Sequence, residues 1–434
     1  MLLPSRLARL SIVAAAAALV LSSCGGDNND NSSGGTDTSG TETSSAPESS
    51  APAGTGDGTL TIGTLLPQTG DLAFLGPPEF AGVDLAVNDI NAAGGVLGQK
   101  VVQSKADSGD GTPDIAGASV DKLLNANADV IIGAAASSVS LSVIDKIVGA
   151  GVVEFSPANT SPAFDTYDDK GLYFRTSPSD VFQGAVLGNL VASDGFTNVA
   201  VMARQDSYGE GLADEFVKTL QQQGGNVAVK TLYSADATNY TAEINKVAAS
   251  KPDAVVLIAF EEATKIVPGL IAKGVGPQDV QTYFVDGDTA DYSKDFPAGT
   301  MKGVKATFPA PAKIDPSFNK SLLDVNPKLT DFTYGAQSYD ATIMTALAAT
   351  AANDDSGESI ASKLIEISKD GTPCSEYSEC VGLLESGEDI DYEGASGPCD
   401  LNDSGSVAKA TIGIQLYGQD NTYKQIDSVS GVID

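Results

Sequence analysis

The chain has 434 residues, of which 42% are hydrophobic, so it is long enough for two globular domains with buried cores. Its 57 acidic residues outnumber its 25 lysines and arginines, and the resulting charge of −32 argues against binding to nucleic-acid phosphates. It contains no histidine, which removes Ser-His and Cys-His dyads and imidazole-bound zinc. We therefore expect no nucleic-acid partner, no metal, no cofactor and no catalytic residue.

The N-terminus has the pattern of an export signal. Arg6 and Arg9 precede the apolar run "LSIVAAAAALVLSSC", which is shorter than a membrane span. The run ends in "LSSC", which resembles the lipobox of bacterial lipoproteins, a family in which the peptide is cut before the cysteine and the cysteine is acylated. The resemblance implies a signal peptide at residues 1–23 and lipidation at Cys24. The alternative is an ordinary secretory signal with an unrelated cysteine.

Residues 24–58 are nearly devoid of apolar side chains and rich in Gly, Ser and Thr. Such a composition cannot bury enough surface to offset chain entropy, so we expect a disordered tether. The chain after it holds no segment long enough to span a bilayer, so membrane attachment would rest on the lipid anchor alone.

The body begins with alternating strand and helix patterns over residues 59–178. A second alternating series follows over residues 179–304. Alternation of this kind predicts parallel sheets built from right-handed crossovers, and two series predict two doubly wound α/β lobes. The expected strands are residues 59–67, 100–107, 129–137 and 152–158, then 198–204, 226–233, 253–260 and 281–287, with helices between them.

The last third of the chain returns to helices at 318–326 and 332–353 and ends in strands at 411–418 and 423–429. This order indicates a chain that crosses between the lobes more than once, through a multi-strand hinge. We expect one lobe to combine residues 59–178 with about 305–405. The other lobe then combines residues 179–304 with about 406–434.

Two turns of the first lobe carry hydroxyl side chains at the carboxyl ends of strands. Ser137 and Ser138 follow "DVIIG", and Thr160 follows "VVEF". Hydroxyls and helix-start N–H groups suit an anionic group such as a carboxylate. The alternative is that these residues only cap helices.

The second lobe offers a carboxylate, and aromatic residues lie between the two sets. Asp286 and Asp288 follow a strand in "YFVDGDTAD", where either of them is able to accept an ammonium group or simply to form a turn. Phe74, Tyr208 and Phe260 lie at other strand ends. An anion pocket, a carboxylate and aromatic walls together describe a site for an amino acid.

The body resembles the Leu/Ile/Val-binding proteins of ABC importers, which have the type I periplasmic-binding fold. The resemblance covers most of residues 59–434 and is carried by "TIGTLLPQTGDLAFLGPPEFAGVDLAVNDINAAGGVLGQKV", "VIIGAAASS", "SPANT", "SPSDVFQG" and "DSYGEGLADEF". It implies a monomer that delivers its ligand to permease and ATPase subunits. By position it implies contacts to the ligand carboxylate from Ser137, Ala158 and Thr160, to the ammonium from Asp286 with Asp288 next, and aromatic contacts from Phe74, Tyr208 and, secondarily, Phe260.

Three cysteines lie close together near the C-terminus. Exported proteins form disulfides, and Cys374–Cys380 would close a short loop. Cys374–Cys399 and Cys380–Cys399 are the rival pairs, and one thiol stays unpaired in each case. We interpret this group as a structural staple.

Three classes of function compete. The first is a lipid-anchored receptor that closes on an amino acid with a branched-chain or other apolar side chain and delivers it to a permease. The second is a receptor of the same fold for an amide, urea or other small carboxylate, or an extracellular sensor domain. The third class is a hydrolase that uses Asp286 and Asp288. The sequence argues against it, because it offers no second acidic loop to flank a scissile bond and no G-x-S-x-G motif.

Overall fold

The computed structural model describes residues 56–110, 113–310 and 316–433. The predicted signal peptide, Cys24 and residues 25–55 of the predicted tether lie outside these residues. Among the described helices, none combines the length and the apolar character that a bilayer crossing requires.

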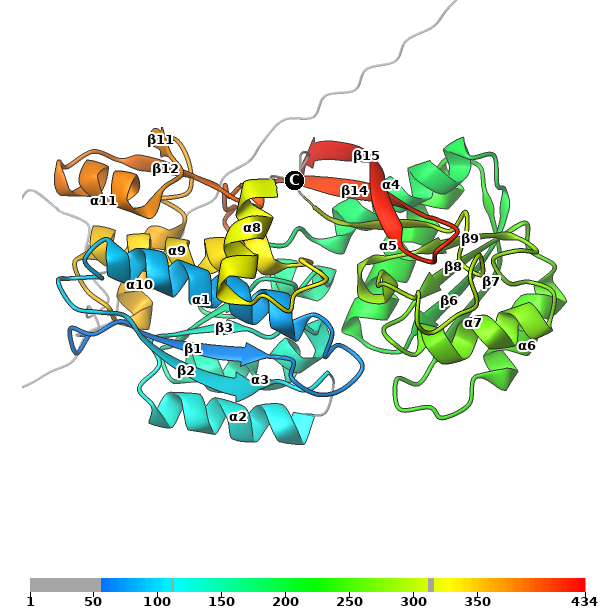
Figure 1. Ribbon diagram of the computed structural model, residues 1–434, viewed down its shortest axis with the longest axis horizontal. Coiled ribbons are helices and arrows are strands. Elements are labelled where there is room, and N and C mark those ends of the chain that lie inside the picture. Colours follow the sequence, from blue (N-terminus) through cyan, green and yellow to red (C-terminus); the bar gives the residue numbers. More distant parts are fainter. Residues whose placement is uncertain (1–55, 111–112, 311–315, 434) are drawn as a thin grey trace, which may run out of the picture. The chain divides into compact units, whose positions relative to one another are not determined.

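The first lobe is built on a sheet of five parallel strands in the order β2-β1-β3-β4-β5 (Figure 1). Alternate side chains of its strands pack on opposite faces: Ile62 lies in the cluster of α1 and α9, whereas Leu65 lies in the cluster of α2 and most of α3. The apolar strands are thus buried on both faces, as a parallel sheet requires. The elements are β1 (Thr61–Leu66), α1 (Gly76–Ala92), β2 (Val102–Asp107), α2 (Pro113–Asn125), β3 (Val130–Gly133), α3 (Ser137–Gly149), β4 (Val153–Ser156), a 3-10 helix (Pro162–Thr166) and β5 (Tyr173–Arg175).

The second lobe is built on a seven-stranded sheet in the order β15-β14-β10-β9-β8-β6-β7. The strands from β10 to β7 are parallel, and the predicted C-terminal strand pair forms an antiparallel hairpin at the sheet edge. The predicted two-lobed α/β class is confirmed. The elements are α4 (Asp180–Ser193), β6 (Asn198–Arg204), α5 (Ser207–Gln222), β7 (Asn226–Tyr233), α6 (Thr241–Ser250), β8 (Ala254–Ile258), α7 (Ala263–Ala272), β9 (Gln281–Phe284), a 3-10 helix (Asp286–Asp288), β10 (Lys305–Pro309), β14 (Lys409–Tyr417) and β15 (Tyr423–Val432).

After β10 the chain returns to the first lobe, where α9 packs along α1. The two helices approach closely because both present glycine: a Cβ on Gly82 would lie 2.1 Å from the carbonyl oxygen of Gly335. The described elements thus run from the first sheet (β1 to β5) to the second (β6 to β10), then to helices packed on the first sheet, and back to the second sheet at β14. The returning elements are α8 (Pro316–Val325), α9 (Gly335–Ala352), α10 (Gly357–Leu364), β11 (Thr372–Cys374), α11 (Tyr377–Glu385), β12 (Ile390–Gly394) and β13 (Gly397–Pro398).

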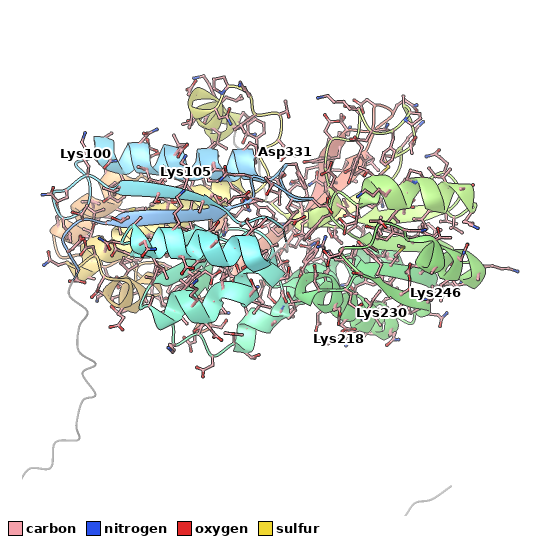
Figure 2. The ribbon with its side chains drawn as sticks, turned by 90° about the horizontal axis from the view of Figure 1, so that it is seen from below. Lys100, Lys105, Lys218, Lys230, Lys246 and Asp331 are labelled. Atoms are coloured by element: carbon pink, nitrogen blue, oxygen red, sulfur yellow. A yellow bond between two sulfur atoms is a disulfide. The ribbon has the colours of Figure 1, made fainter. Side chains whose placement is uncertain are left out.

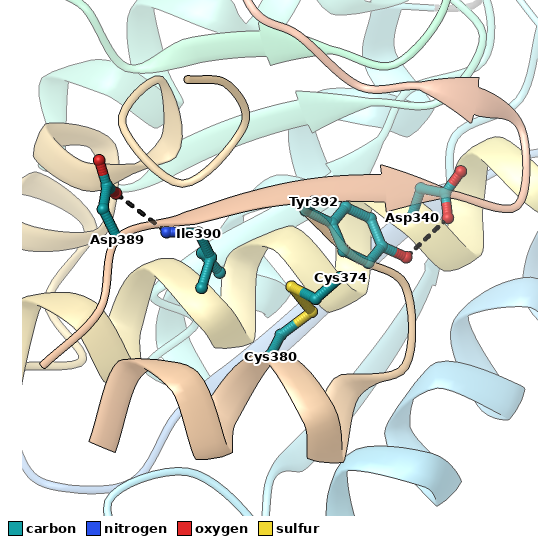
Figure 3. Close-up of a disulfide and its surroundings, with 6 residues drawn as sticks. All are labelled: Asp340, Cys374, Cys380, Asp389, Ile390 and Tyr392. Carbon is teal, nitrogen blue, oxygen red and sulfur yellow. Dashed lines mark hydrogen bonds between the residues drawn. A yellow bond between two sulfur atoms is a disulfide. The ribbon is translucent and has the colours of Figure 1, made fainter. Parts of the chain in front are cut away.

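Of the cysteines in the described residues, Cys374 and Cys380 form a disulfide between the end of β11 and α11 (Figure 3). Cys399 is buried and has a free thiol. Near the disulfide, the hydroxyl of Tyr392 donates to Asp340 at 2.9 Å and so joins β12 to α9. Strands β11, β12 and β13 form a small three-stranded sheet, and the disulfide links its β11 to α11.

Replacing both Cys374 and Cys380 by serine is expected to lower the free energy of unfolding by about 2 kcal/mol. The sequence separation of 6 closes only a short loop, which constrains the unfolded chain modestly. Chemical denaturation of the wild type and the double variant measures the difference. Equal stabilities would contradict a structural role for the bridge.

Lysine side chains lie on both lobes, as the labelled lysines show (Figure 2). Lys105 in the first lobe pairs with Asp84 at 2.5 Å, and Lys218 in the second lobe pairs with Glu215 at 2.8 Å. Both lysines are well exposed, so these pairs contribute little to stability. The acidic excess thus leaves the surface strongly negative, which favours solubility.

Candidate functional site

Strand ends of both lobes meet at one small cavity of about 20 Å³. In open α/β sheets this edge is where ligands bind. A single water needs about 10–15 Å³, so the side chains themselves nearly fill the space. The lining residues are Leu72, Leu75, Ala135, Ala136, Ser137, Ala158, Thr160, Tyr208, Phe260, Asp286, Gly287 and Tyr334.

Ser137 lies at the first turn of α3 and is buried. The N-cap, Ala136, offers no side-chain cap, and the Ser137 hydroxyl instead accepts a hydrogen bond from the N–H of Ser161 at 3.3 Å. The helix-capping alternative therefore does not describe Ser137. The N-terminus of α3 brings N–H groups and partial positive charge to the cavity, which suits an anion.

The turns after β3 and β4 are tied together beneath the cavity. The side-chain amide of Asn159 donates to the carbonyl oxygens of Ala134 at 3.0 Å and Ala135 at 2.9 Å. Asn159 is fully buried and immediately precedes Thr160. Its two hydrogen bonds therefore fix the spacing between Thr160 and the turn that carries Ser137.

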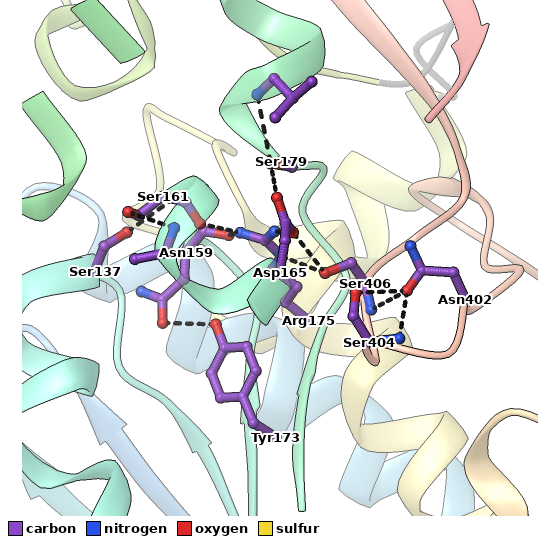
Figure 4. Close-up of polar contacts among 12 residues, drawn as sticks. Ser137, Asn159, Ser161, Asp165, Tyr173, Arg175, Ser179, Asn402, Ser404 and Ser406 are labelled. Carbon is purple, nitrogen blue, oxygen red and sulfur yellow. Dashed lines mark hydrogen bonds and ion pairs between the residues drawn. The ribbon is translucent and has the colours of Figure 1, made fainter. Parts of the chain in front are cut away.

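The buried Arg175 also bonds to the turn that follows β4 (Figure 4). The Arg175 guanidinium donates to the carbonyl oxygens of Ser161 at 2.9 Å and Asn159 at 3.3 Å, and to the Ser406 hydroxyl at 2.8 Å. It also forms an ion pair with Asp165. Because the planar guanidinium bonds several groups at once, it fixes the path of the chain around the predicted anion contacts.

Asp286 is the main acidic group of the cavity. Its carboxylate accepts hydrogen bonds from the hydroxyls of Tyr208 at 2.6 Å and Tyr334 at 2.8 Å, and from the side-chain amide of Gln183 at 2.9 Å. Tyr334 precedes α9 of the first lobe, so this hydrogen bond links the lobes. Burial raises the pKa of Asp286, and the three donors oppose that rise.

Two further carboxyls are buried in this region, Asp180 close to Asp286 and Glu79 close enough to Tyr334 to raise its pKa. Asp180, at the start of α4, and Glu79, in α1, have no hydrogen-bond partner for either oxygen among the described residues. Burial, and then the negative charge of Asp286, raise the pKa of Asp180 well above its ordinary value; the nearby Thr160 hydroxyl opposes this without reaching hydrogen-bond geometry. Burial alone raises the pKa of Glu79. Concentrated carboxyls in a low-dielectric site favour an incoming cation.

Tyr208 is held by a stack of planar groups. Its ring lies on Phe260, with centroids 5.5 Å apart and planes 23° apart. The Arg204 guanidinium carbon lies 3.4 Å from the centroid of Phe260 and forms ion pairs with Asp206 and Glu262. The stack aims the Tyr208 hydroxyl at Asp286, which explains an aromatic residue at the start of α5.

Three predicted residues do not line the cavity. Phe74 is half-buried in the neighbouring apolar cluster, and Leu72 and Leu75 of the same segment take its place. Ser138 lies at the start of α3 without lining the cavity. The Asp288 carboxylate instead accepts from the N–H of Val285 at 2.8 Å and shapes the turn.

Three residues near the cavity escaped sequence reasoning: Asp180, Gln183 and Tyr334. Asp180 and Gln183 belong to "SPSDVFQG", a segment that carries the family resemblance but whose pattern predicts no role for either side chain. Tyr334 lay inside a predicted helix, whereas the structure places it before α9 with a φ of 60°. Nothing in the helical periodicity marked it.

Comparison with known proteins places the fold in a family. The family described as "Periplasmic binding protein" matches residues 59–378, and the chain belongs to it. It is 29% identical over 273 residues to a leucine-, isoleucine-, valine-, threonine- and alanine-binding protein of Pseudomonas aeruginosa, covering 61% of this chain and 70% of the relative.

Two further similarities extend over more of the chain. A chemotactic signal transduction system substrate-binding protein of Halobacterium salinarum is 24% identical over 359 residues, covering 79% of this chain and 83% of the relative. The crystal structure of a leucine-binding protein of Thermotoga maritima superposes with a TM-score of 0.71 at 19% identity, covering 85% of this chain and 98% of that one. The predicted family and its fold are confirmed.

Proposed function

We propose that this protein is the solute receptor of an ABC importer, anchored by a lipid outside the cytoplasm, and that it captures a zwitterionic amino acid between its lobes. The observation that carries the proposal is the pairing in one cavity of hydroxyl and N–H donors from the first lobe with the Asp286 carboxylate of the second. The amino-acid-binding relative supports this ligand class. We propose no catalytic step: the ligand is bound and released unchanged.

The binding mode follows from the two sides of the cavity. The ligand carboxylate would accept from Ser137, Thr160 and the N–H of Ala158, which without ligand donates to the Ser156 hydroxyl at 3.2 Å. The ligand ammonium would donate to Asp286. Leu72 and Leu75, with the alanines after β3, offer an apolar surface for the side chain. The ligand contacts both lobes only when the lobes are close together. Binding would therefore shift the population of the protein towards the closed form.

The test is calorimetric titration of the purified protein in detergent with leucine, isoleucine and valine. Their deaminated acids and leucinamide serve as matched controls, since each lacks one charged group. We expect binding of the amino acids and much weaker binding of both controls. Binding of the deaminated acid or of leucinamide instead would contradict the zwitterion site and favour another small ligand of the same fold.

Ser137→Ala is expected to weaken amino-acid binding by about 1.5–3 kcal/mol, because it removes a hydrogen bond to a charged acceptor. The neighbouring Ser138→Ala is the matched control and should leave the Kd unchanged, since Ser138 does not line the cavity. Titration of both variants decides the matter. Equal effects would contradict a specific role for Ser137.

Lipid attachment at Cys24 belongs to the same proposal and rests on the "LSSC" motif. Radiolabelled palmitate should be incorporated into the wild type and not into Cys24→Ser. A tether of about 34 residues would reach roughly 30–35 Å, enough to contact a permease in the same membrane. Equal labelling of the two proteins would contradict the anchor.

A sensory role is the second candidate, and the chemotactic relative supports it. Both roles use the same cavity, so they differ only in the membrane partner. Crosslinking in cells separates them: an importer role predicts a permease as the captured neighbour, whereas a sensory role predicts a transmembrane receptor.

A further inference from the structure

A second, larger chamber lies between the lobes, with a volume of about 360 Å³. Helix α8 and the segment before α9 supply one wall from the first lobe, and β10 with the β14–β15 hairpin supplies the other from the second lobe. Small-molecule sites have volumes of about 300–1,000 Å³, so this chamber has room for a compact ligand.

The walls of the chamber are mainly aromatic. Phe308, Phe318, Phe332 and Tyr423 are only half-buried, and Phe308 and Tyr423 meet edge to face with centroids 6.1 Å apart. Rings that keep exposed apolar surface inside a concave site favour a ligand that covers them.

The buried polar groups of the chamber are neutral. Gln415 and Gln337 are 1% and 5% exposed, and each side chain ends in a carboxamide, which both donates and accepts hydrogen bonds. The charged lining residues are nearer to solvent: Asp291 and Lys424 are exposed. Asp331, labelled in Figure 2, is half-buried and accepts from the Tyr423 hydroxyl at 3.3 Å.

We propose that this chamber is a second binding site, for a small uncharged molecule that carries an aromatic or alicyclic ring and a carboxamide, hydroxyl or carbonyl group. The ring packs against the aromatic walls, and the polar group bonds to Gln337 or Gln415. A formal charge on the ligand is disfavoured, because no buried ionised side chain in the described lining compensates it.

The chamber is coupled to the smaller cavity through Tyr334, which lines both. The smaller cavity has only about 20 Å³, so an amino acid requires its lining to move back. Among the residues that line the smaller cavity, Tyr334 also borders the free space of the larger chamber. A molecule in the chamber removes that space, and we expect it to weaken amino-acid binding. This coupling, unlike the chamber itself, rests on the proposed function.

The site is tested by calorimetric titration with benzamide and phenol, with benzoate and benzylamine as charged analogues. We expect the neutral probes to bind at least tenfold more tightly than the charged ones. Asn319→Trp fills the chamber from α8 and should abolish probe binding, whereas Lys320→Trp, whose native side chain is 78% exposed, should not. Thr422→Trp fills the opposite wall if Asn319→Trp fails to fold.

Probe binding that survives in a folded Asn319→Trp or Thr422→Trp, or no probe binding to the wild type, overturns the site. The coupling is read from leucine titrations with saturating benzamide, which should raise the leucine Kd at least threefold; leucine should raise the benzamide Kd by the same factor. An unchanged leucine Kd overturns the coupling. Benzamide binding without any amino-acid binding overturns the proposed function and supports the chamber as an independent site.

Discussion

Asp286→Asn is expected to weaken amino-acid binding by about 2–5 kcal/mol, which is roughly 30-fold to several-thousand-fold in Kd. The substitution removes the negative charge that would pair with the ligand ammonium in a buried site. It keeps the shape of the side chain and an oxygen that accepts from one of the two tyrosines. Calorimetric titration with the tightest-binding amino acid measures the effect.

The stability of the same variant separates loss of binding from loss of folding. Burial raises the pKa of Asp286, so its ionised form costs folding energy at neutral pH and the neutral amide does not. The unfolding midpoint of Asp286→Asn without ligand should therefore equal or exceed that of the wild type. Asp295→Ala, at an exposed position of the same segment between β9 and β10, serves as the control for binding. Normal binding by Asp286→Asn would place the ammonium site elsewhere, with Asp180 the next candidate.

Much of the fold was predictable because its signals are local. Long apolar strands separated by amphipathic helices define both sheets, and the glycine-rich helix ends mark their boundaries. In the two large sheets, the sequence patterns do not predict β5 and β10, which carry no alternating pattern. Pairing orders both strands: β5 pairs with β4, and β10 pairs with β9 and with β14, which is distant in the sequence.

The site was predictable where a residue follows a strand directly and was missed where only tertiary packing places it. Ser137, Thr160 and Asp286 stand at strand ends, where topology alone brings them together. Asp180 has the local pattern of an ordinary acidic residue in a first helical turn, and its complete burial beside Asp286 is set by tertiary packing. Phe74 was predicted to line the cavity and does not, because a loop sequence does not indicate which of its apolar side chains points into the cavity.

Glu154→Gln is expected to increase stability at alkaline pH, because Glu154 carries an isolated buried carboxyl in β4. The side chain is fully buried, and neither oxygen has a hydrogen-bond partner in the part of the chain that the structure describes. Burial raises its pKa from the ordinary value of 4.5 to about 8; the Ser140 hydroxyl and the N–H of Ala134 lie near enough to oppose only part of this rise.

The sign of the pH dependence follows from this raised pKa. Below pH 4.5 the carboxyl is protonated in both the folded and the unfolded chain, so the variant gains nothing from removing it. Between pH 4.5 and about 8 the unfolded chain releases the proton and the folded chain keeps it, so wild-type stability falls as the pH rises. One pKa unit corresponds to about 1.4 kcal/mol, so the free energy of unfolding of Glu154→Gln should exceed that of the wild type by about 3–5 kcal/mol near pH 9.

Denaturant unfolding of both proteins from pH 4 to pH 9 isolates this contribution, because the other titrating groups cancel in the difference. Glu385→Gln, a substitution of the same type at an exposed position, serves as the control. A flat difference for Glu154→Gln would mean that Glu154 ionises normally. In that case the β4 core, which leads directly into the turn carrying Ala158 and Thr160, would have to admit water beside a charged carboxylate.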